Sequence, residues 1–147
     1  AYEIFIGRRI EGQSAKGDYS VVATKTFPLA QKSLWRFLSS EEGLQIWLQP
    51  LVNFTLRPGE TFEIAGGIYG EVRTMKIPER VRIRWEEMDW RKPSILQMAV
   101  IPRKNGKSVL IFQHENLVDL RLRFKIRSYW KKVINDLHQA VQQRGKL

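Results

Sequence analysis

The chain has 147 residues, no cysteine, and 25 Lys and Arg against 15 Asp and Glu, which gives a formal net charge of +10. Without cysteine it has no disulfide, no thiolate nucleophile and no cysteine-bearing zinc site, and a cytoplasmic location is the natural expectation. Apolar runs such as Val109 to Phe112 are far shorter than the roughly 20 residues needed to cross a bilayer, so we expect no membrane span.

The first half of the chain predicts an arm, a strand and two short helices. Residues 1–16 mix charge with glycine and serine, and we interpret them as an extended N-terminal arm that leads into one domain, residues 17–147. Residues 19–27 are rich in β-branched and aromatic types and stop before Pro28, which predicts a strand. Two helices should follow, because apolar residues then recur at helical spacing: Leu34, Phe37 and Leu38, followed by Leu44, Trp47 and Leu48.

The middle of the chain changes to a strand-like period. Val81, Ile83 and Trp85 alternate with charged residues, which predicts a strand with one buried face. Asn105-Gly106 is a strong two-residue hairpin signal, since both central positions of a type I′ turn need positive φ. Turn residues separate six predicted strands, namely residues 54–56, 60–64, 68–77, 80–88, 95–102 and 107–116.

The C-terminal segment predicts one long amphipathic helix. Its apolar stripe consists of Leu122, Ile126, Tyr129, Trp130, Val133, Ile134, Leu137 and Val141. Only the concave face of the sheet offers enough apolar area to cover this stripe. We therefore predict an α+β fold, in which a curved seven-stranded antiparallel sheet wraps around the long C-terminal helix, with two short helices after the first strand.

Several motifs, in this order and spacing, resemble a known superfamily. They are Phe27-Pro28, Leu34-Trp35, Trp47, the segment from Leu56 to Phe62, the segment from Pro78 to Trp85, the segment from His114 to Leu117, and Trp130. The chain is similar to START/Bet v 1-like (SRPBCC) proteins, and within them to the activator of Hsp90 ATPase homolog 1-like family, with a lead-in that looks like that of bacterial members. The resemblance implies a helix-grip fold, often with a hydrophobic cavity between helix and sheet. It implies no single activity, because relatives include lipid carriers, hormone receptors, cyclases and co-chaperones.

The first functional hypothesis is a non-catalytic binding domain for a hydrophobic small molecule. Its cavity would be lined by Trp47, Phe62, Ile64, Tyr69, Ile83, Trp85, Met98, Trp130, Val133 and Leu137. The same residues would also make an ordinary packed core, and that alternative stays open.

The second hypothesis is a protein-interaction module, with a chaperone as one possible partner. It would use a basic surface formed by Arg121, Arg123, Lys125, Arg127, Lys131 and Lys132. The first part of this segment alternates charged and apolar residues, so it could be an extended loop before the helix or a basic rim around the cavity mouth. Nucleic-acid binding and a merely solvated face are the alternatives.

Catalysis has little support in the residue inventory. His114 and His138 are the only histidines and are not spaced as a ligand pair, so we predict neither a metal site nor a cofactor. We interpret Glu86, Glu87 and Asp89 as carboxylates of a solvated turn. A cyclase-like enzyme, which needs only a polar group inside a cavity, remains a further alternative.

Overall fold

The computed structural model describes residues 18–88 and 92–144, so the predicted arm, residues 1–16, lies outside the described part. A 3₁₀ turn, Lys104–Gly106, joins the last two strands. The helices and strands, in chain order, are β1 (Tyr19–Phe27), α1 (Gln31–Ser39), α2 (Glu41–Trp47), β2 (Thr61–Ile64), β3 (Ile68–Lys76), β4 (Arg80–Glu87), β5 (Ser94–Pro102), β6 (Ser108–Leu117) and α3 (Leu120–Arg144).

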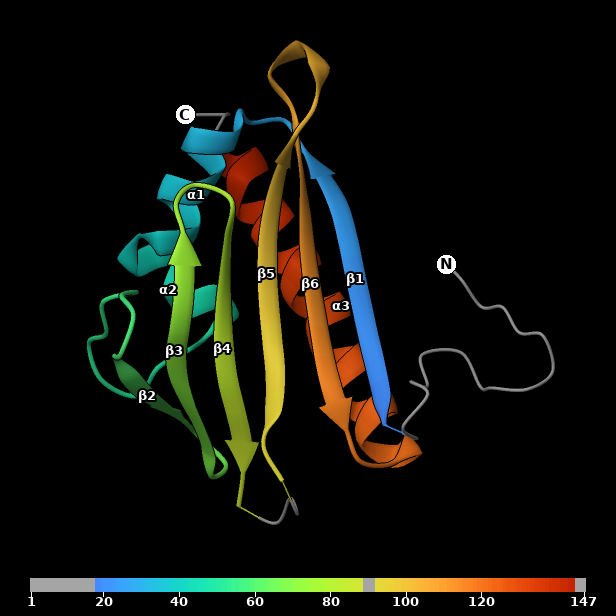
Figure 1. Cartoon of the computed structure of the whole chain (residues 1–147). Coiled ribbons are helices and arrows are strands. Elements are labelled where there is room, and N and C mark those ends of the chain that lie inside the picture. Colours follow the sequence, from blue (N-terminus) through green and yellow to red (C-terminus); the bar gives the residue numbers. More distant parts are fainter. Residues whose placement is uncertain (1–17, 89–91, 145–147) are drawn as a thin grey trace, which may run out of the picture.

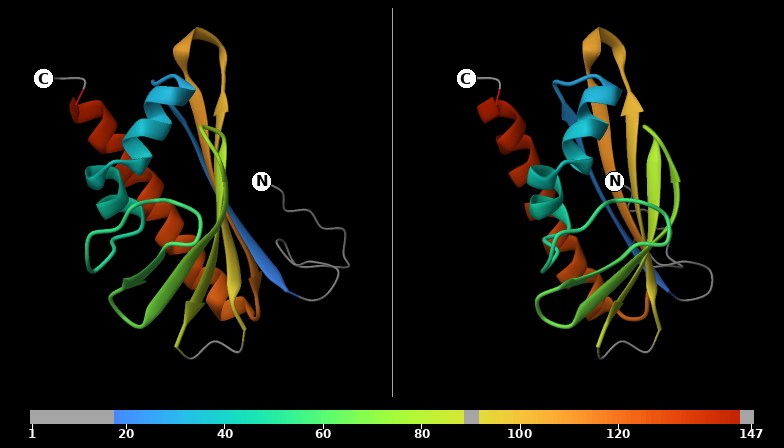
Figure 2. Two further views of the ribbon diagram at one scale, coloured as in Figure 1. Left: turned by 60° about the vertical axis from the view of Figure 1, so that its left-hand side comes forward. Right: turned by 90° about the vertical axis from the view of Figure 1, so that its left-hand side faces the viewer.

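The six strands form one curved antiparallel sheet in the order β1-β6-β5-β4-β3-β2 (Figure 1). The three labelled helices all lie on the same side of this sheet, and α3 runs along it (Figure 2). The first turns of α3 lie near the start of β1, while its last turns lie beside α1. This arrangement confirms the predicted helix-grip fold and its long C-terminal helix.

Strand alternation buries one face of the sheet under the helices. In β4, Val81, Ile83 and Trp85 are buried while Arg80 and Arg82 are exposed, as the sequence pattern predicts. Strands β5 and β6 alternate in the same way along their lengths. Because successive strand side chains point to opposite faces, a single register places all of these apolar side chains on the face that the helices cover.

The predicted count of seven strands is wrong, because residues 54–56 form no strand. The apolar residues there serve the core instead: Leu56 is buried, and the ring of Phe54 lies 5.0 Å from that of Phe62. A backbone hydrogen bond from the Leu51 N–H to the Glu63 carbonyl ties the preceding part of this loop to β2. A short apolar run of this kind signals burial and does not by itself signal strand pairing.

The hairpin between β5 and β6 turns where the sequence predicts, but the predicted two-residue turn is wrong: Arg103 N–H donates to the Lys107 carbonyl at 2.8 Å, so Lys104–Gly106 form a three-residue turn. Asn105 and Gly106 have φ values of 63° and 70°, so both adopt positive φ. This is the conformation for which Asn-Gly is suited.

Helix α3 begins at Leu120, so the basic segment from Arg121 to Arg127 is helical, and the alternative of an extended loop before the helix is wrong. The Asp119 carboxylate accepts a hydrogen bond from the Leu122 N–H at 2.9 Å, which caps the first turn. The predicted stripe is buried at Ile126, Trp130, Val133, Ile134, Leu137 and Val141. Each such side chain contributes about 1.5–3 kcal/mol on burial, which fixes α3 to the sheet. None of the helices in the described ranges is long and apolar enough to span a membrane.

Candidate functional site

The structure places nine of the ten predicted cavity residues in the core. They are Trp47, Phe62, Ile64, Ile83, Trp85, Met98, Trp130, Val133 and Leu137. The tenth, Tyr69, is 43% exposed, so its predicted place in the cavity is wrong. The strand alternation points Gly70 and Val72 inward, so Tyr69 points to the opposite, uncovered face.

Aromatic rings fill the middle of the interface between α3 and the sheet. The Trp130 ring stacks on Phe112 with centroids 4.5 Å apart, and Trp85 meets Trp130 edge-on at 5.6 Å. Trp47 lies 5.7 Å from Phe112 on the other side. The centre of the interface is therefore a packed aromatic core, and such ring pairs add about 0.5–1.5 kcal/mol each beyond their burial.

A buried polar chain runs through this aromatic core. The Trp130 Nε1–H donates to His114 Nδ1 at 3.0 Å, and His114 Nε2 lies 2.7 Å from Ser94 Oγ. Because Nδ1 accepts, the ring proton sits on Nε2 and is donated to Ser94, which donates in turn to the Trp85 carbonyl at 2.9 Å. Burial lowers the pKa of His114 to about 3, so the ring is neutral. This geometry describes a structural bridge, because its members are buried and their hydrogen bonds go to one another.

Sequence reasoning missed Ser94, although the sequence carries a signal for it. Ser94 and His114 both occupy inward positions of strands whose other inward residues are apolar. A polar residue at such a position needs a buried partner, so two of them on neighbouring strands indicate a pair.

A recess opens between the first turns of α3 and the adjoining ends of β3 and β4. We call it the Glu87 recess; its volume is about 310 Å³, and it is lined by Ile68, Trp85, Glu87, Lys125, Ile126, Ser128, Tyr129 and Lys132. Of the ten predicted cavity residues, Trp85 is the one that lines it. The recess lies between the long helix and the sheet, where the family resemblance places a cavity.

Two buried polar atoms at the Glu87 recess lack partners in the part of the chain that the structure describes. The Glu87 side chain is 9% exposed; its Oε1 accepts from Lys125 Nζ at 2.7 Å, while its Oε2 has no partner. The interpretation of Glu87 as part of a solvated turn is therefore wrong. The Trp85 Nε1–H is likewise buried and unpaired. A buried donor or acceptor left unsatisfied costs about 1–3 kcal/mol, and both atoms belong to residues that line the recess.

Tyr129 forms a wall of the Glu87 recess and does not serve as a base. Its hydroxyl donates to the Trp47 carbonyl at 3.1 Å, and burial raises its pKa to about 12. The phenol therefore stays protonated at neutral pH and holds its ring against Trp85, with centroids 6.1 Å apart.

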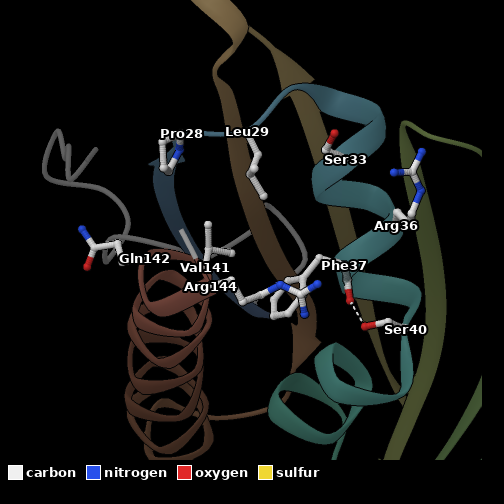
Figure 3. A pocket seen from close by; sticks show the side chains of 9 residues that line it. All are labelled: Pro28, Leu29, Ser33, Arg36, Phe37, Ser40, Val141, Gln142 and Arg144. Atoms are coloured by element: carbon white, nitrogen blue, oxygen red, sulfur yellow. Dashed lines mark hydrogen bonds between the residues drawn. The ribbon is translucent and has the colours of Figure 1, made fainter. Parts of the chain in front are cut away.

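A second recess lies at the opposite end of α3 (Figure 3). We call it the Arg144 recess; its volume is about 880 Å³, and it is lined by Pro28, Leu29, Ser33, Arg36, Phe37, Ser40, Val141, Gln142 and Arg144. These residues come from the β1–α1 connection, from one face of α1 and from the last turns of α3. None of the predicted cavity residues contributes to it.

Five of the six residues of the predicted basic surface are exposed or half-buried on α3, whereas Arg123 is buried. Arg121, Lys125, Lys131 and Lys132 are exposed on α3, and Arg127 is half-buried. Arg123 is only 7% exposed, and its Nε–H donates to the Ser20 carbonyl at 3.2 Å, so it ties α3 to β1. Lys125 and Lys132 are paired with Glu87 and Asp136 respectively. Among the residues that the structure covers, no three His, Asp or Glu side chains are grouped as a metal site would require.

Comparison with known proteins identifies the family. Several solved structures share this fold: CalU16 from Micromonospora echinospora (15% identity, covering 88% of this chain and 78% of that one, TM-score 0.73), the Aha1 dimer from Colwellia psychrerythraea (13%, 83% and 95%, 0.69), and an HSP90 activator from Plasmodium falciparum (22%, 67% and 73%, 0.56). No curated protein matches the chain. The family model described as activator of Hsp90 ATPase homolog 1-like protein matches residues 29–142. The chain therefore belongs to the activator of Hsp90 ATPase homolog 1-like family.

Proposed function

We propose that this chain is a non-catalytic binding domain that holds a small apolar molecule with a hydrogen-bond donor, such as a hydroxyl group, in the Glu87 recess. Membership of the family supports a binding role or an Hsp90-activator-like role. The observation that carries the proposal is the unpaired Glu87 Oε2, a buried acceptor in a recess whose walls include Ile68, Trp85 and Ile126. A cytoplasmic location belongs to the same proposal, because the chain contains no cysteine.

The size and chemistry of the recess define the class of ligand. A volume of about 310 Å³ lies at the lower end of ligand pockets, which span roughly 300–1,000 Å³. Glu87 Oε2 would accept from the ligand hydroxyl, and the Trp85 Nε1–H would donate to a ligand oxygen. Lys125 already neutralises the carboxylate through its ion pair, so the ligand needs no charge of its own. A compact hydroxylated aromatic or alicyclic compound meets these requirements.

The experiment is a thermal-shift screen of compact hydroxylated aromatic and alicyclic compounds, each paired with its O-methyl ether. A ligand at a hundred times its Kd stabilises by about 2.7 kcal/mol, which raises the Tm of a domain of this size by roughly 5–10 °C. We expect the hydroxyl compound to exceed its ether, because the ether leaves Glu87 Oε2 without a donor. Equal shifts for both members of every pair would contradict the proposed role of Glu87.

A pair of variants on the exposed side of α3 tests the location. Ser128 lines the recess and is exposed, so Ser128→Phe should fill the recess without disturbing the core. Asn135→Phe, two turns later on the same helix, is the matched control, because Asn135 is exposed and does not line the recess. We expect the ligand-induced shift to disappear in the first variant and persist in the second.

A second candidate function is an interaction with a chaperone of the Hsp90 type. Family membership and the exposed basic surface of α3 favour it, since Arg121, Arg127 and Lys131 make no ion pair with any part of the described chain. The test is the ATPase rate of purified Hsp90 with the wild-type chain and with Arg121→Glu/Lys131→Glu. A stimulation that the charge reversal removes would support this function, and an unchanged ATPase rate with the wild type would contradict it.

A further inference from the structure

The Arg144 recess has a different chemistry from the Glu87 recess and lies at the far end of α3. One face of α1 supplies Ser33, Arg36 and Phe37, which are spaced three and four residues apart, and Ser40 follows at the junction of α1 and α2. The last turns of α3 supply Val141 and Arg144. Figure 3 shows Leu29, Val141 and Phe37 directed toward the space between the two helices. The recess is thus a groove between two helices that the fold brings side by side.

The floor of the Arg144 recess is apolar. Phe37 and Val141 are each 6% exposed and belong to the hydrophobic core, and the half-buried Leu29 packs against it. A volume of about 880 Å³ falls within the range of small-molecule pockets. The floor can therefore cover the apolar body of a ligand.

The rim of the Arg144 recess is cationic. The Arg144 guanidinium carbon lies 5.2 Å from the centroid of the Phe37 ring and pairs with Glu42 at the protein surface. The Arg36 side chain makes no hydrogen bond or ion pair with any residue in the described ranges. The nine residues that line the recess include two arginines and no carboxylate. A guanidinium has five N–H donors, so Arg144 can keep its contact with Glu42 and still bind a second anion.

From this combination we propose that the Arg144 recess is a second, separate ligand site that takes an amphipathic carboxylate, with the carboxylate at Arg144 and the apolar chain along Phe37, Val141 and Leu29, while Arg36 adds positive charge to the outer rim. The charge of the rim selects the anion, and the apolar floor selects a carboxylate that carries an alkyl or aromatic body. The Glu87 recess has the opposite preference, since its buried polar group is itself a carboxylate. The two sites therefore sort ligands by charge.

The experiment measures binding of dodecanoate and dodecanol by isothermal titration calorimetry at 150 mM salt, below the concentration at which micelles form. We expect the carboxylate to bind at least about tenfold more tightly than the alcohol, because a charge-assisted hydrogen bond contributes more than a neutral one. Arg36→Gln/Arg144→Gln should remove this preference. The matched control, Arg121→Gln/Arg127→Gln, makes the same change in net charge near the other end of α3 and should retain it.

Filling each recess in turn separates this proposal from the proposed function. Ser33→Phe should abolish dodecanoate binding, whereas Ser128→Phe, the same substitution at the Glu87 recess, should leave it intact. The proposal is overturned if the wild type does not bind dodecanoate, if the Arg36→Gln/Arg144→Gln variant binds it as tightly as the wild type, or if Ser128→Phe is the variant that abolishes binding. None of these results depends on whether a hydroxyl compound binds beside Glu87.

Discussion

The middle and the two ends of α3 differ sharply, although all three regions pack against the same face of the sheet. The middle is filled by Trp130 and its aromatic neighbours, and its polar atoms are bonded to one another through His114. The ends open into the Glu87 and Arg144 recesses, one with a buried carboxylate and the other with two arginines. In this helix-grip fold the packed middle supplies stability, and the two proposed binding sites lie at the open ends.

The largest expected effect tests the packed middle. Trp130→Ala removes a fully buried ring and leaves His114 Nδ1 without its donor, so we expect a loss of about 3–5 kcal/mol in the free energy of unfolding. Tyr69→Ala is the aromatic control on the uncovered sheet face and should cost less than about 1 kcal/mol. Urea denaturation followed by fluorescence measures both. Similar losses for the two variants would mean that the middle is not the stabilising region.

The next effect is the dependence of stability on pH that His114 creates. The pKa of this ring is about 3 in the folded chain and 6.5 ordinarily, so between these values the unfolded chain binds more protons. Stability should therefore fall as the pH drops from about 6.5 toward 3, by about 1.4 kcal/mol per pH unit from this group. NMR of the His114 ring protons provides a direct check, since they should not titrate between pH 7 and pH 5. A midpoint near 6.5 would contradict the buried neutral ring.

A smaller effect distinguishes the Glu87 recess from the core. Glu87→Met removes a buried charge and an unpaired acceptor, and leaves Lys125, which is 60% exposed, free to be solvated. We expect this variant to be neutral or more stable by about 1 kcal/mol. Lys125→Met should instead cost about 1–3 kcal/mol, because it leaves the Glu87 carboxylate buried without a counter-charge. Urea denaturation of both variants tests this asymmetry, and equal losses would argue against a carboxylate kept for binding.

The smallest expected effect concerns the basic surface. Arg121→Gln and Lys131→Gln lie on the exposed side of α3 and should change the free energy of unfolding by less than about 0.5 kcal/mol each. Arg123→Gln is the contrasting variant, because its side chain is buried and bonded to Ser20. Thermal denaturation of the three variants should separate Arg123 clearly from the other two. A large loss at Arg121 or Lys131 would mean that the basic surface is structural.

Much of the fold could be predicted because its signals are local. Alternation in β4, positive φ at Asn105-Gly106 and the helical stripe of α3 each follow from residues close in sequence. The failures depend on distant contacts. Phe54 and Leu56 serve the core, where Phe54 meets Phe62, and the placement of Tyr69 was wrong because its inward neighbour is Gly70. A side chain at Gly70 would collide with the Phe62 ring, so the inward position next to Tyr69 carries no apolar side chain, and Val72 alone indicates the buried face there.

The candidate sites were harder to predict than the fold. The sequence pattern identified Trp85 and the exposed lysines of α3, but Glu87 looked like one of several carboxylates at a strand end. Its burial depends on Lys125, 38 residues later in the chain. The Arg144 recess combines Leu29, Phe37 and Val141, which ordinary core patterns explain equally well. A groove arises from the way two helices cross, and that geometry leaves no periodic signal in the sequence.

The most direct test of the binding role is NMR of the indole N–H groups during titration with a hydroxylated aromatic compound identified in the screen. The Trp85 Nε1–H is unpaired, whereas the N–H groups of Trp47 and Trp130 donate to the Leu38 carbonyl and to His114. We predict that the Trp85 signal, assigned with Trp85→Phe, shifts on binding while the other two remain in place, and that Ser128→Phe abolishes the shift. Binding that leaves the Trp85 signal unchanged, or that moves it equally in Ser128→Phe, would contradict the Glu87 recess as the ligand site.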